Sequence, residues 1–281
     1  ADVSAVDPRL LPETAVVSPD GALSIGGVAV SELAARFGTP LFVYDEKHLR
    51  NRCRQAVAEF GEDGVVYATK AFLCGAMARL AHEEGLLLDV ATGGELFAAT
   101  AAGVPAGRCV LHGNNKSTDE LRLAITSGVN HIIVDSFDEL DRLDALHVEG
   151  LPVPHVQLRI TPGVHAHTHE FVSTGQDDSK FGFNLANGDA MRAIERAKSS
   201  SSVVLTGIHC HIGSNVLDAS LFAKASEVMV DLFRGLDLPE LTLGGGLGVA
   251  YTAGDAAPTM REWADAVRSA TASLPKGTKV R

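Results

Sequence analysis

Two short apolar runs, VVYATK (residues 65–70) and LLLDVA (residues 86–91), decide the fold. An Ala- and Leu-rich stretch of helical character lies between them and ends at Gly85, a residue type that commonly closes helices. An apolar strand, a helix and a second apolar strand are typical of a parallel βαβ unit. These two runs therefore predict a parallel sheet whose strands are connected by helices.

The same alternation continues along the rest of the sequence. Further short strands are expected at residues 109–112, 131–135, 155–160, 203–211, 241–243 and 279–281. Helices between them are expected to begin at the capping sequences Ser117-x-x-Glu120, Ser136-x-x-Glu139 and Thr259-x-x-Glu262, or to span residues 95–102, 188–198 and 219–234. Seven units and the start of an eighth strand favour an α/β fold, a (β/α)8 barrel of the TIM type. We expect the eighth strand to be incomplete and the sheet to keep two open edges.

An open, doubly wound sheet is the alternative arrangement for this alternation. Such sheets usually carry a cofactor on a GxGxxG loop after the first strand, and none follows residues 65–70. The Gly-rich run after the seventh strand has Gly244 and Gly246, but its third position is Val249. The barrel is therefore favoured for residues 46–281. Residues 1–45 do not fit the alternation, and their hairpin and short helix are expected to form an addition to the barrel.

Composition restricts the class of protein. The 281 residues include 24 Lys and Arg and 35 Asp and Glu, for a formal charge of −11, so the chain lacks the basic surface of a general nucleic-acid binder. No apolar run approaches the roughly 18 residues of a membrane span, and the acidic N-terminus does not resemble a signal peptide. We therefore expect a soluble, cytoplasmic protein. Its four cysteines form no CxxC pair and are expected to be buried in a reducing compartment: Cys53, Cys74, Cys109 and Cys210.

Most of the expected strands end in an ionisable residue or in glycine. Barrel enzymes build their sites at the carboxyl ends of the strands. Any one of these residues could be an ordinary loop residue, but together they indicate a site at one end of the barrel. They are Lys70, Asp89, His112 with Asn114 and Asn115, Asp135, Arg159, His209, His211 and Gly244–Gly246.

Lys70 and the glycine run indicate the chemistry. A lysine pointing into the barrel mouth and partly desolvated becomes an amine nucleophile toward aldehydes, although a lysine that extends into solvent is the competing interpretation. The backbone N–H groups of Gly244–Gly248 suit a phosphate, and Ser214 could add a hydroxyl from the neighbouring loop; a plain Gly-rich turn is the alternative. With the flat ring of His211, these groups match the requirements of pyridoxal 5′-phosphate.

Eight segments occur in this order: YATKAF (67–72), DVATGGEL (89–96), HGNNKS (112–117), RITPG (159–163), HAHTH (165–169), DSKFGF (178–183), GIHCHIGS (207–214) and GGGLG (244–248). Together they resemble the barrel-fold (fold-type III) pyridoxal-phosphate-dependent decarboxylases, whose barrel is of the alanine racemase and ornithine decarboxylase kind. The lysine and GGG segments are shared across related amino-acid decarboxylases. The GNNKS, AHTH and DSKFGF segments resemble the branch that acts on diaminopimelate.

The resemblance implies a role for each site residue. Lys70 would bond covalently to the cofactor, His211 would stack on its ring, and Ser214, Gly245 and Gly246 would hold its phosphate. Asp89 and His209 would lie beside the ring, and Arg159 and Asn114 would lie toward the substrate, below a loop at residues 161–180. The implied reaction converts meso-2,6-diaminopimelate to L-lysine and CO2 in lysine biosynthesis, in a homodimer with shared active sites.

The family also has elements that this sequence lacks. They are a Glu-Pro-Gly-Arg stretch on the eighth strand and a C-terminal β-domain that contributes a Cys and a Tyr. The sequence reaches Val280-Arg281 without them. We therefore expect the pyridine-nitrogen partner and part of the substrate site to lie outside this sequence. Residues 1–45 are expected to associate with that β-domain.

Three alternatives remain open at this stage. The chain could be a barrel that binds pyridoxal phosphate without catalysis, or a decarboxylase of another basic amino acid such as ornithine or arginine. A metal-dependent hydrolase is the third, because His209 and His211, and His165, His167 and His169, have a spacing that metals can use. The lysine on the first strand favours pyridoxal phosphate over a metal.

Overall fold

The computed structural model describes residues 6–164 and 180–281. The HAHTH segment, the first two residues of DSKFGF and most of the expected 161–180 loop therefore lie outside the described residues.

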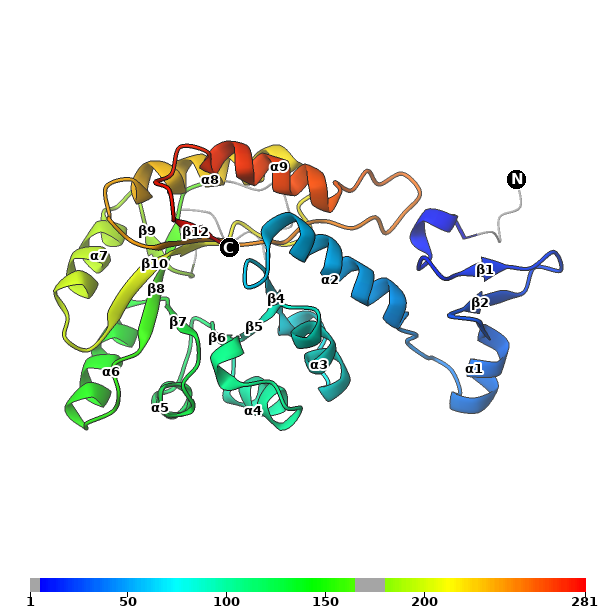
Figure 1. Ribbon diagram of the computed structural model, residues 1–281, viewed down its shortest axis with the longest axis horizontal. Coiled ribbons are helices and arrows are strands. Elements are labelled where there is room, and N and C mark those ends of the chain that lie inside the picture. Colours follow the sequence, from blue (N-terminus) through cyan, green and yellow to red (C-terminus); the bar gives the residue numbers. More distant parts are fainter. Residues whose placement is uncertain (1–5, 165–179) are drawn as a thin grey trace.

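Within this part of the chain, eight parallel strands form one sheet in chain order (Figure 1). They are β4 (Val66–Ala68), β5 (Leu87–Val90), β6 (Cys109–Leu111), β7 (His131–Val134), β8 (His155–Thr161), β10 (Val204–Cys210), β11 (Glu240–Leu243) and β12 (Lys279–Val280). A two-residue strand, β9 (Phe183–Asn184), pairs with β8 off this path. Among the described residues no ladder joins β12 to β4, so these strands are the two edges of the sheet. The predicted α/β barrel architecture is confirmed.

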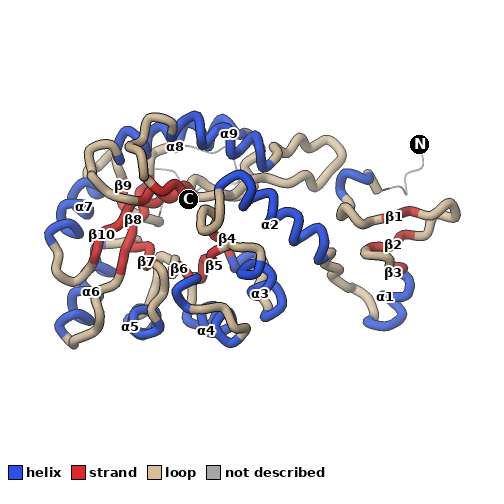
Figure 2. Tube along the Cα trace, viewed as in Figure 1, coloured by secondary structure: helices blue, strands red, loops and turns tan. Residues whose placement is uncertain are grey.

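Helices cover the outside of the curved sheet, and Figure 2 shows the strands inside an arc of helices. They are α2 (Glu46–Phe60), α3 (Gly75–Glu83), α4 (Gly93–Ala101), α5 (Thr118–Ser127), α6 (Phe137–Val148), α7 (Asp189–Ser199), α8 (Ala219–Phe233) and α9 (Met260–Thr271). Reciprocal capping boxes open α5 at Ser117 and α9 at Thr259, as the sequence predicts. Single 3-10 turns lie at Thr69–Ala71 (η2) and Ala106–Arg108 (η3).

Helix α2 is a feature that the sequence analysis missed. Asp45 caps it by accepting a hydrogen bond from the backbone N–H of His48, and its buried face carries Cys53 and Ala56. The helix packs on α9, where Arg268 Nη1 lies 2.9 Å from Glu59 Oε2 and the rings of Phe60 and Trp263 are 4.9 Å apart. The ring of helices is therefore continuous from α9 to α2, beside the two edges of the sheet.

The N-terminal segment forms a small unit apart from the barrel (Figure 1). Strands β1 (Val16–Val17), β2 (Leu23–Ile25) and β3 (Val28–Ala29) make an antiparallel sheet, followed by α1 (Val30–Phe37). The expected hairpin and helix are confirmed, and β3 is additional. A 3-10 turn, η1 (Pro8–Leu10), precedes the sheet. The unit is tied to the start of α2 by Thr14 Oγ1, which donates to Asp45 Oδ2 at 2.6 Å.

All four cysteines are free, and three of them are buried as expected. Cys74 is exposed, so the prediction of burial is wrong for it. The residue is the N-cap of α3 and so precedes the buried face of that helix. None of the described helices has the length and apolar character needed to cross a membrane.

Candidate active site

The alternation of side chains along each strand divides the barrel interior into levels. Successive side chains of a strand point to opposite faces, so residues two apart share a face. Leu87, Val110 and Ile133 form an apolar cluster of their own, separate from the main core between strands and helices. Two positions further along the same strands are Asp89, His112 and Asp135. The residues above this apolar level are therefore ionisable and belong to the carboxyl end of the barrel.

Five strands bring ionisable side chains together at this end. His112 Nε2 lies 3.9 Å from Asp89 Oδ2, and its ring meets the ring of His209 edge-on at 5.1 Å. Arg159 on β8 lies 3.7 Å from Asp135 Oδ1, and its guanidinium is 4.5 Å from the centre of the Phe181 ring. The structure thus joins residues that are up to 120 positions apart in the sequence into one site.

Burial sets the protonation of this cluster. It raises the pKa of Asp89 to about 7, although the charges of Lys70 and Arg159 act in the opposite direction. It lowers the pKa values of His112 and His209 well below their ordinary value, and that of His211 to about 3, with further lowering by Arg159 and Lys70. At neutral pH the three imidazoles are therefore uncharged rings. Asp89 is the group that titrates near neutral pH.

Lys70 does not lie on the first barrel strand, where the sequence analysis placed it. Strand β4 ends at Ala68, and Lys70 is in the η2 turn with its side chain exposed. The expectation of a partly desolvated ammonium on the strand itself is therefore wrong for this structure, because the chain turns before the lysine. The turn is fixed to the neighbouring strand, since Thr69 Oγ1 donates to the carbonyl of Asp89 at 2.7 Å. The charge of Lys70 acts on Asp89, His112, His209 and His211, which links it to the same site.

The loops that follow β10 and β11 are joined through their backbones. The N–H of Val216 donates to the carbonyl of Gly246 at 2.8 Å, and the N–H of Gly248 donates to the carbonyl of Val216 at 2.9 Å. Gly246 has a φ of +104°, and a Cβ there would lie 2.1 Å from the Gly213 carbonyl oxygen and 3.3 Å from Ser214 Cα. A Cβ on Gly244 would lie 2.7 Å from His211 Nδ1. Glycine is required here because the two loops approach so closely.

This junction keeps backbone donors available. Within residues 6–164 and 180–281, the N–H groups of Gly245 and Gly246 donate to no backbone carbonyl. Ser214, on the adjacent loop, is half-buried beside them. Consecutive free N–H groups form a concavity that suits an anion. The predicted phosphate residues are therefore adjacent to one another.

Two residues lie at the edge of the cluster: Asn114, which the sequence predicted as a site residue, and Lys116, which it did not. Asn114 is exposed, and its amide is 3.5 Å from the carbonyl of Lys180. Lys116, two residues later, was not predicted as a site residue; it is buried and forms an ion pair of 2.8 Å with Glu139. Glu139 was interpreted only as part of a capping sequence. The signal for the pair was present as a lysine in HGNNKS and a glutamate after Ser136, but their contact depends on the fold.

Comparison with known proteins defines the family. Residues 46–281 match the family described as "Pyridoxal-dependent decarboxylase, pyridoxal binding domain". This chain belongs to the pyridoxal-dependent decarboxylases. A relative named diaminopimelate decarboxylase from Mycobacterium tuberculosis is 46% identical over 268 residues, which cover 92% of this chain and 60% of that protein. One of the same name from Bacillus subtilis is 48% identical over 84% of this chain and 56% of that protein. The chain therefore spans about 60% of the length of these curated relatives.

Solved structures of the family show the same architecture. Diaminopimelate decarboxylase from M. jannaschii, in complex with L-lysine, aligns with a TM-score of 0.84 and 32% identity over 95% of this chain and 64% of that chain. The enzyme of the same name from Helicobacter pylori, also with L-lysine, aligns with a TM-score of 0.81 and 28% identity over 89% of this chain. These likenesses cover the barrel described above.

The described residues of this decarboxylase-family chain fit a pyridoxal phosphate. The anion-binding concavity at Gly245 and Gly246 suits its phosphate, and an accessible amine at Lys70 suits its aldehyde. The buried His209 Nδ1 has no hydrogen-bond partner among the described residues, as expected of a polar atom that faces a bound group. No group of three or more His, Cys, Asp or Glu in the described ranges is arranged to hold a metal ion, and His165, His167 and His169 lie outside those ranges.

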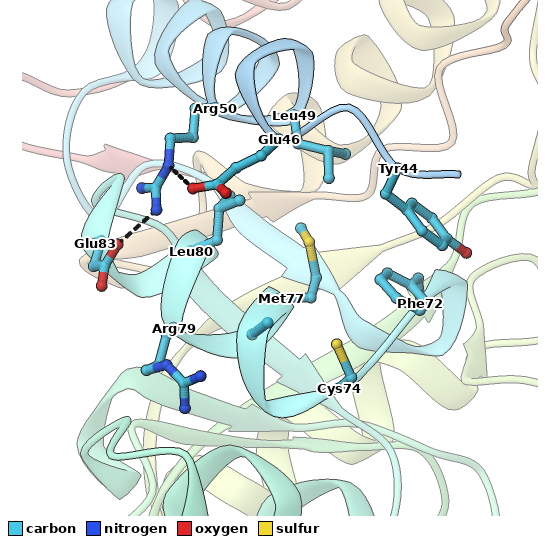
Figure 3. A pocket seen from close by; sticks show the side chains of 11 residues that line it. Tyr44, Glu46, Leu49, Arg50, Phe72, Cys74, Met77, Arg79, Leu80 and Glu83 are labelled. Carbon is cyan, nitrogen blue, oxygen red and sulfur yellow. Dashed lines mark hydrogen bonds and ion pairs between the residues drawn. The ribbon is translucent and has the colours of Figure 1, made fainter. Parts of the chain in front are cut away.

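A separate cavity of about 430 Å3 lies on the outside of the barrel between α2 and α3 (Figure 3). Its wall includes the stacked rings of Tyr44 and Phe72, with centroids 4.1 Å apart, and the thiol of Cys74. Arg50 lies at its edge and pairs with Glu46 and Glu83. The lining includes none of the strand-end residues, so this cavity is distinct from the candidate active site of the family barrel.

Proposed function

We propose that this chain is the cofactor-binding barrel of a diaminopimelate decarboxylase, which converts meso-2,6-diaminopimelate to L-lysine and CO2. The observation that carries the proposal is the meeting of Lys70, the Asp89–histidine cluster and the Gly245–Gly246 concavity at one end of the barrel. Relatives named diaminopimelate decarboxylase, 46% and 48% identical, support the choice of substrate. So do the family structures that hold L-lysine, which is the product of this reaction.

Each residue has a role in this proposal. Lys70 attaches the cofactor covalently, and the backbone of Gly245 and Gly246 with the hydroxyl of Ser214 holds its phosphate. His211 supplies an uncharged ring for stacking. Asp89 and His209 line the cofactor, and Arg159 and Asn114 lie on the substrate side.

The chemistry divides between cofactor and protein. Bound pyridoxal phosphate supplies an electron sink for the carbanion that remains when CO2 leaves. The protein binds and orients. His112, His209 and His211 are uncharged and add no positive charge to the site, because burial holds their pKa values low. Asp89, with its pKa of about 7, can hold or release a proton at its carboxyl near neutral pH. Arg159 carries a buried positive charge that can orient a substrate carboxylate.

The remaining features of the proposal concern the whole protein. Residues 1–45 associate with a β-domain, and residues 46–281 form the barrel domain. The protein acts in the cytoplasm as a homodimer with shared active sites, it takes a small amino acid as its partner, and it uses neither nucleic acid nor membrane. Analytical ultracentrifugation of the full-length protein measures the dimer directly.

Turnover by the full-length protein tests the function. Purified protein loaded with pyridoxal phosphate is assayed for CO2 and L-lysine from meso-diaminopimelate, with ornithine and arginine as competing substrates. We expect release from diaminopimelate alone. Bound cofactor with no CO2 from any of the three would support a non-catalytic barrel, and preference for ornithine or arginine would contradict the proposed substrate.

A further inference from the structure

Lys116 is a fully buried cation whose hydrogen bonds are all made within the protein. Its Nζ lies 2.6 Å from the carbonyl oxygen of Gly113, 2.7 Å from that of Ile133 and 2.8 Å from Glu139 Oε1. The two carbonyls accept hydrogen bonds from the ammonium, and the Glu139 carboxylate balances its charge as an ion pair. They belong to the loop after β6, to β7 and to α6 respectively. One side chain thus connects three successive elements at the carboxyl end of the barrel.

Glu139 extends the connection to the end of β7. Its Oε2 accepts a hydrogen bond of 3.0 Å from the backbone N–H of Asp135. The Asp135 side chain makes two further contacts. Its Oδ2 accepts a hydrogen bond from the N–H of Gly182 at 3.0 Å, and its Oδ1 lies 3.7 Å from Arg159 Nη1. A Cβ on Gly182 would lie 2.7 Å from the carbonyl of Arg159, so that contact is close as well. The chain of contacts therefore runs from Lys116 through Glu139 and Asp135 to Arg159.

The loop held by Lys116 also carries His112. Gly113, whose carbonyl accepts from Lys116, directly follows His112, and its φ of +111° brings it close to the Ala91 carbonyl. His112 in turn faces Asp89 and His209. Lys116 therefore holds the backbone on which one of the site imidazoles is mounted, while it does not touch the site itself.

We propose that Lys116 and Glu139 form a positioning pair, which holds His112 and the Asp135–Arg159 unit at the places that the decarboxylation site requires. The inference rests on the proposed function. The pair acts through its neighbours and contacts neither substrate nor cofactor. Its contribution is the placement of two site side chains from β6 and β8, whereas Lys70 and the phosphate concavity belong to β4, β10 and β11.

A purely stabilising role makes a different prediction. Desolvation of two buried charges offsets much of their attraction, so a buried pair replaced by apolar residues of similar size often leaves stability unchanged or raised. The variant K116M/E139L removes both charges and every bond of the pair. If the pair positions, this variant folds but has a displaced His112. If the pair only stabilises, a variant that folds well should work well.

The chain offers a matched control. Arg122 of α5 and Glu149 at the end of α6 form an ion pair of 2.7 Å on the outside of the barrel, with 39% and 49% of their side chains exposed. The pair lies in the same stretch of chain as Lys116–Glu139 but has no contact with the strand ends. R122M/E149L therefore reports the effect of removing an ion pair without moving the site.

The experiment measures three properties of the full-length protein. The melting temperature reports folding, and the imidazole resonances of His112, read by NMR in cofactor-free protein and assigned with H112Q, report positioning without activity. Steady-state kinetics with diaminopimelate reports function. For K116M/E139L we expect a shifted His112 resonance and a kcat lowered by about tenfold or more, with KM and the Kd for pyridoxal phosphate changed by less than about threefold. For R122M/E149L we expect resonances and kcat close to wild type.

The outcomes separate the two proposals. A folded K116M/E139L protein with an unshifted His112 resonance and wild-type kcat would overturn the positioning role, as would a double variant that fails to fold. If the wild-type protein released no CO2 from diaminopimelate, the proposed function would fail. The resonance would still support or overturn positioning, because it is measured without cofactor or substrate.

Discussion

The two ends of the barrel interior are built from similar ionisable residues but partner them differently. At the amino end, the Glu240 carboxylate meets three groups: Gln157 Nε2 at 3.0 Å, His131 Nε2 at 3.3 Å and Arg281 Nη1 at 3.3 Å. At the carboxyl end, Asp89 and His112 are 3.9 Å apart, and the buried His209 Nδ1 has no partner among the described residues. The amino end thus gathers its groups within 3.3 Å of one carboxylate, whereas Asp89 and His112 at the carboxyl end stay 3.9 Å apart.

Within one fold, the amino end of the barrel serves stability and the carboxyl end serves function. At the amino end the Arg281–Glu240 ion pair, with the uncharged His131 beside it, lies at the bottom of the interior, where barrels do not place their chemistry. At the carboxyl end Asp89 and His209 have no ion pair as close among the described residues, and burial raises the pKa of Asp89 to about 7 and lowers that of His209 well below its ordinary value, as is common at functional sites. Substitutions at the amino end should therefore lower stability, and those at the carboxyl end should lower cofactor binding or activity.

The largest expected effect is that of K70A at the carboxyl end. Lys70 is exposed and makes no hydrogen bond or ion pair with the described residues, so its loss should leave the melting temperature unchanged. Loss of the amine should lower kcat of the full-length protein about a thousandfold or more, and should abolish the visible absorbance of covalently bound cofactor. K224A, at an exposed lysine of α8, is the control. Equal loss in both variants would contradict the special role of Lys70.

E240A tests the opposite end and should act on stability alone. It leaves the buried Arg281 and His131 without their carboxylate, and breaking a buried pair in this way costs about 4 kcal/mol. Chemical denaturation of the full-length protein measures the loss of unfolding free energy. The Kd for pyridoxal phosphate should not change, because the site lies at the other end of the strands. A weakened cofactor affinity in a protein that remains folded would show that the two ends are coupled.

The pH dependence of stability in D89N tests the buried carboxyl of the functional end. The folded pKa of Asp89 is about 7, against an ordinary value of 3.8. Between these values the folded state binds more protons than the unfolded state, so Asp89 lowers stability as pH rises from 4 to 7. The difference between these two pKa values limits the loss of unfolding free energy to roughly 4 kcal/mol. Water at the open rim should reduce the loss to about 2 kcal/mol.

The measurement is the unfolding free energy of cofactor-free protein as a function of pH. D89N should be close to wild type at pH 4 and more stable than wild type at pH 8, because the asparagine does not ionise. Parallel pH curves for the two proteins would show that Asp89 is not desolvated at this end of the barrel.

Sequence periodicity predicted the strands of this fold well and one helix not at all. Each barrel strand is a short apolar run bounded by polar or Gly residues, which is a local signal. Helix α2 carries local signals that the sequence analysis overlooked: Leu49, Cys53, Val57 and Phe60 recur at intervals of three and four residues, and Asp45 and Gly61 cap its ends. Only its packing against α9, more than 200 residues later, has no local signature.

The site was predictable only where a residue type carries its own chemistry. Lys70 and the Gly244–Gly246 run are recognisable without a structure. Their surroundings are not: the exposure of Lys70 follows from the early end of β4, and the Lys116–Glu139 pair joins the loop after β6 to helix α6. The partnering of His131 with Glu240 likewise depends on strands far apart in the sequence.

The smallest expected effect comes from the glycine loop, and it refines the contrast between the two ends. In G246A the new Cβ would lie 2.1 Å from the Gly213 carbonyl, at a φ of +104° that disfavours alanine, so the two loops must separate. We expect the Kd for pyridoxal phosphate to rise about tenfold, or about 1.4 kcal/mol, with kcat retained at saturating cofactor. G254A in the same region is the control, because its Cβ would meet only Thr252 Oγ1 at 3.9 Å. Cofactor titration followed by absorbance measures both variants. An unchanged Kd in G246A would mean that the concavity between these loops does not hold the phosphate, and the functional end would then depend on Lys70 and the buried cluster alone.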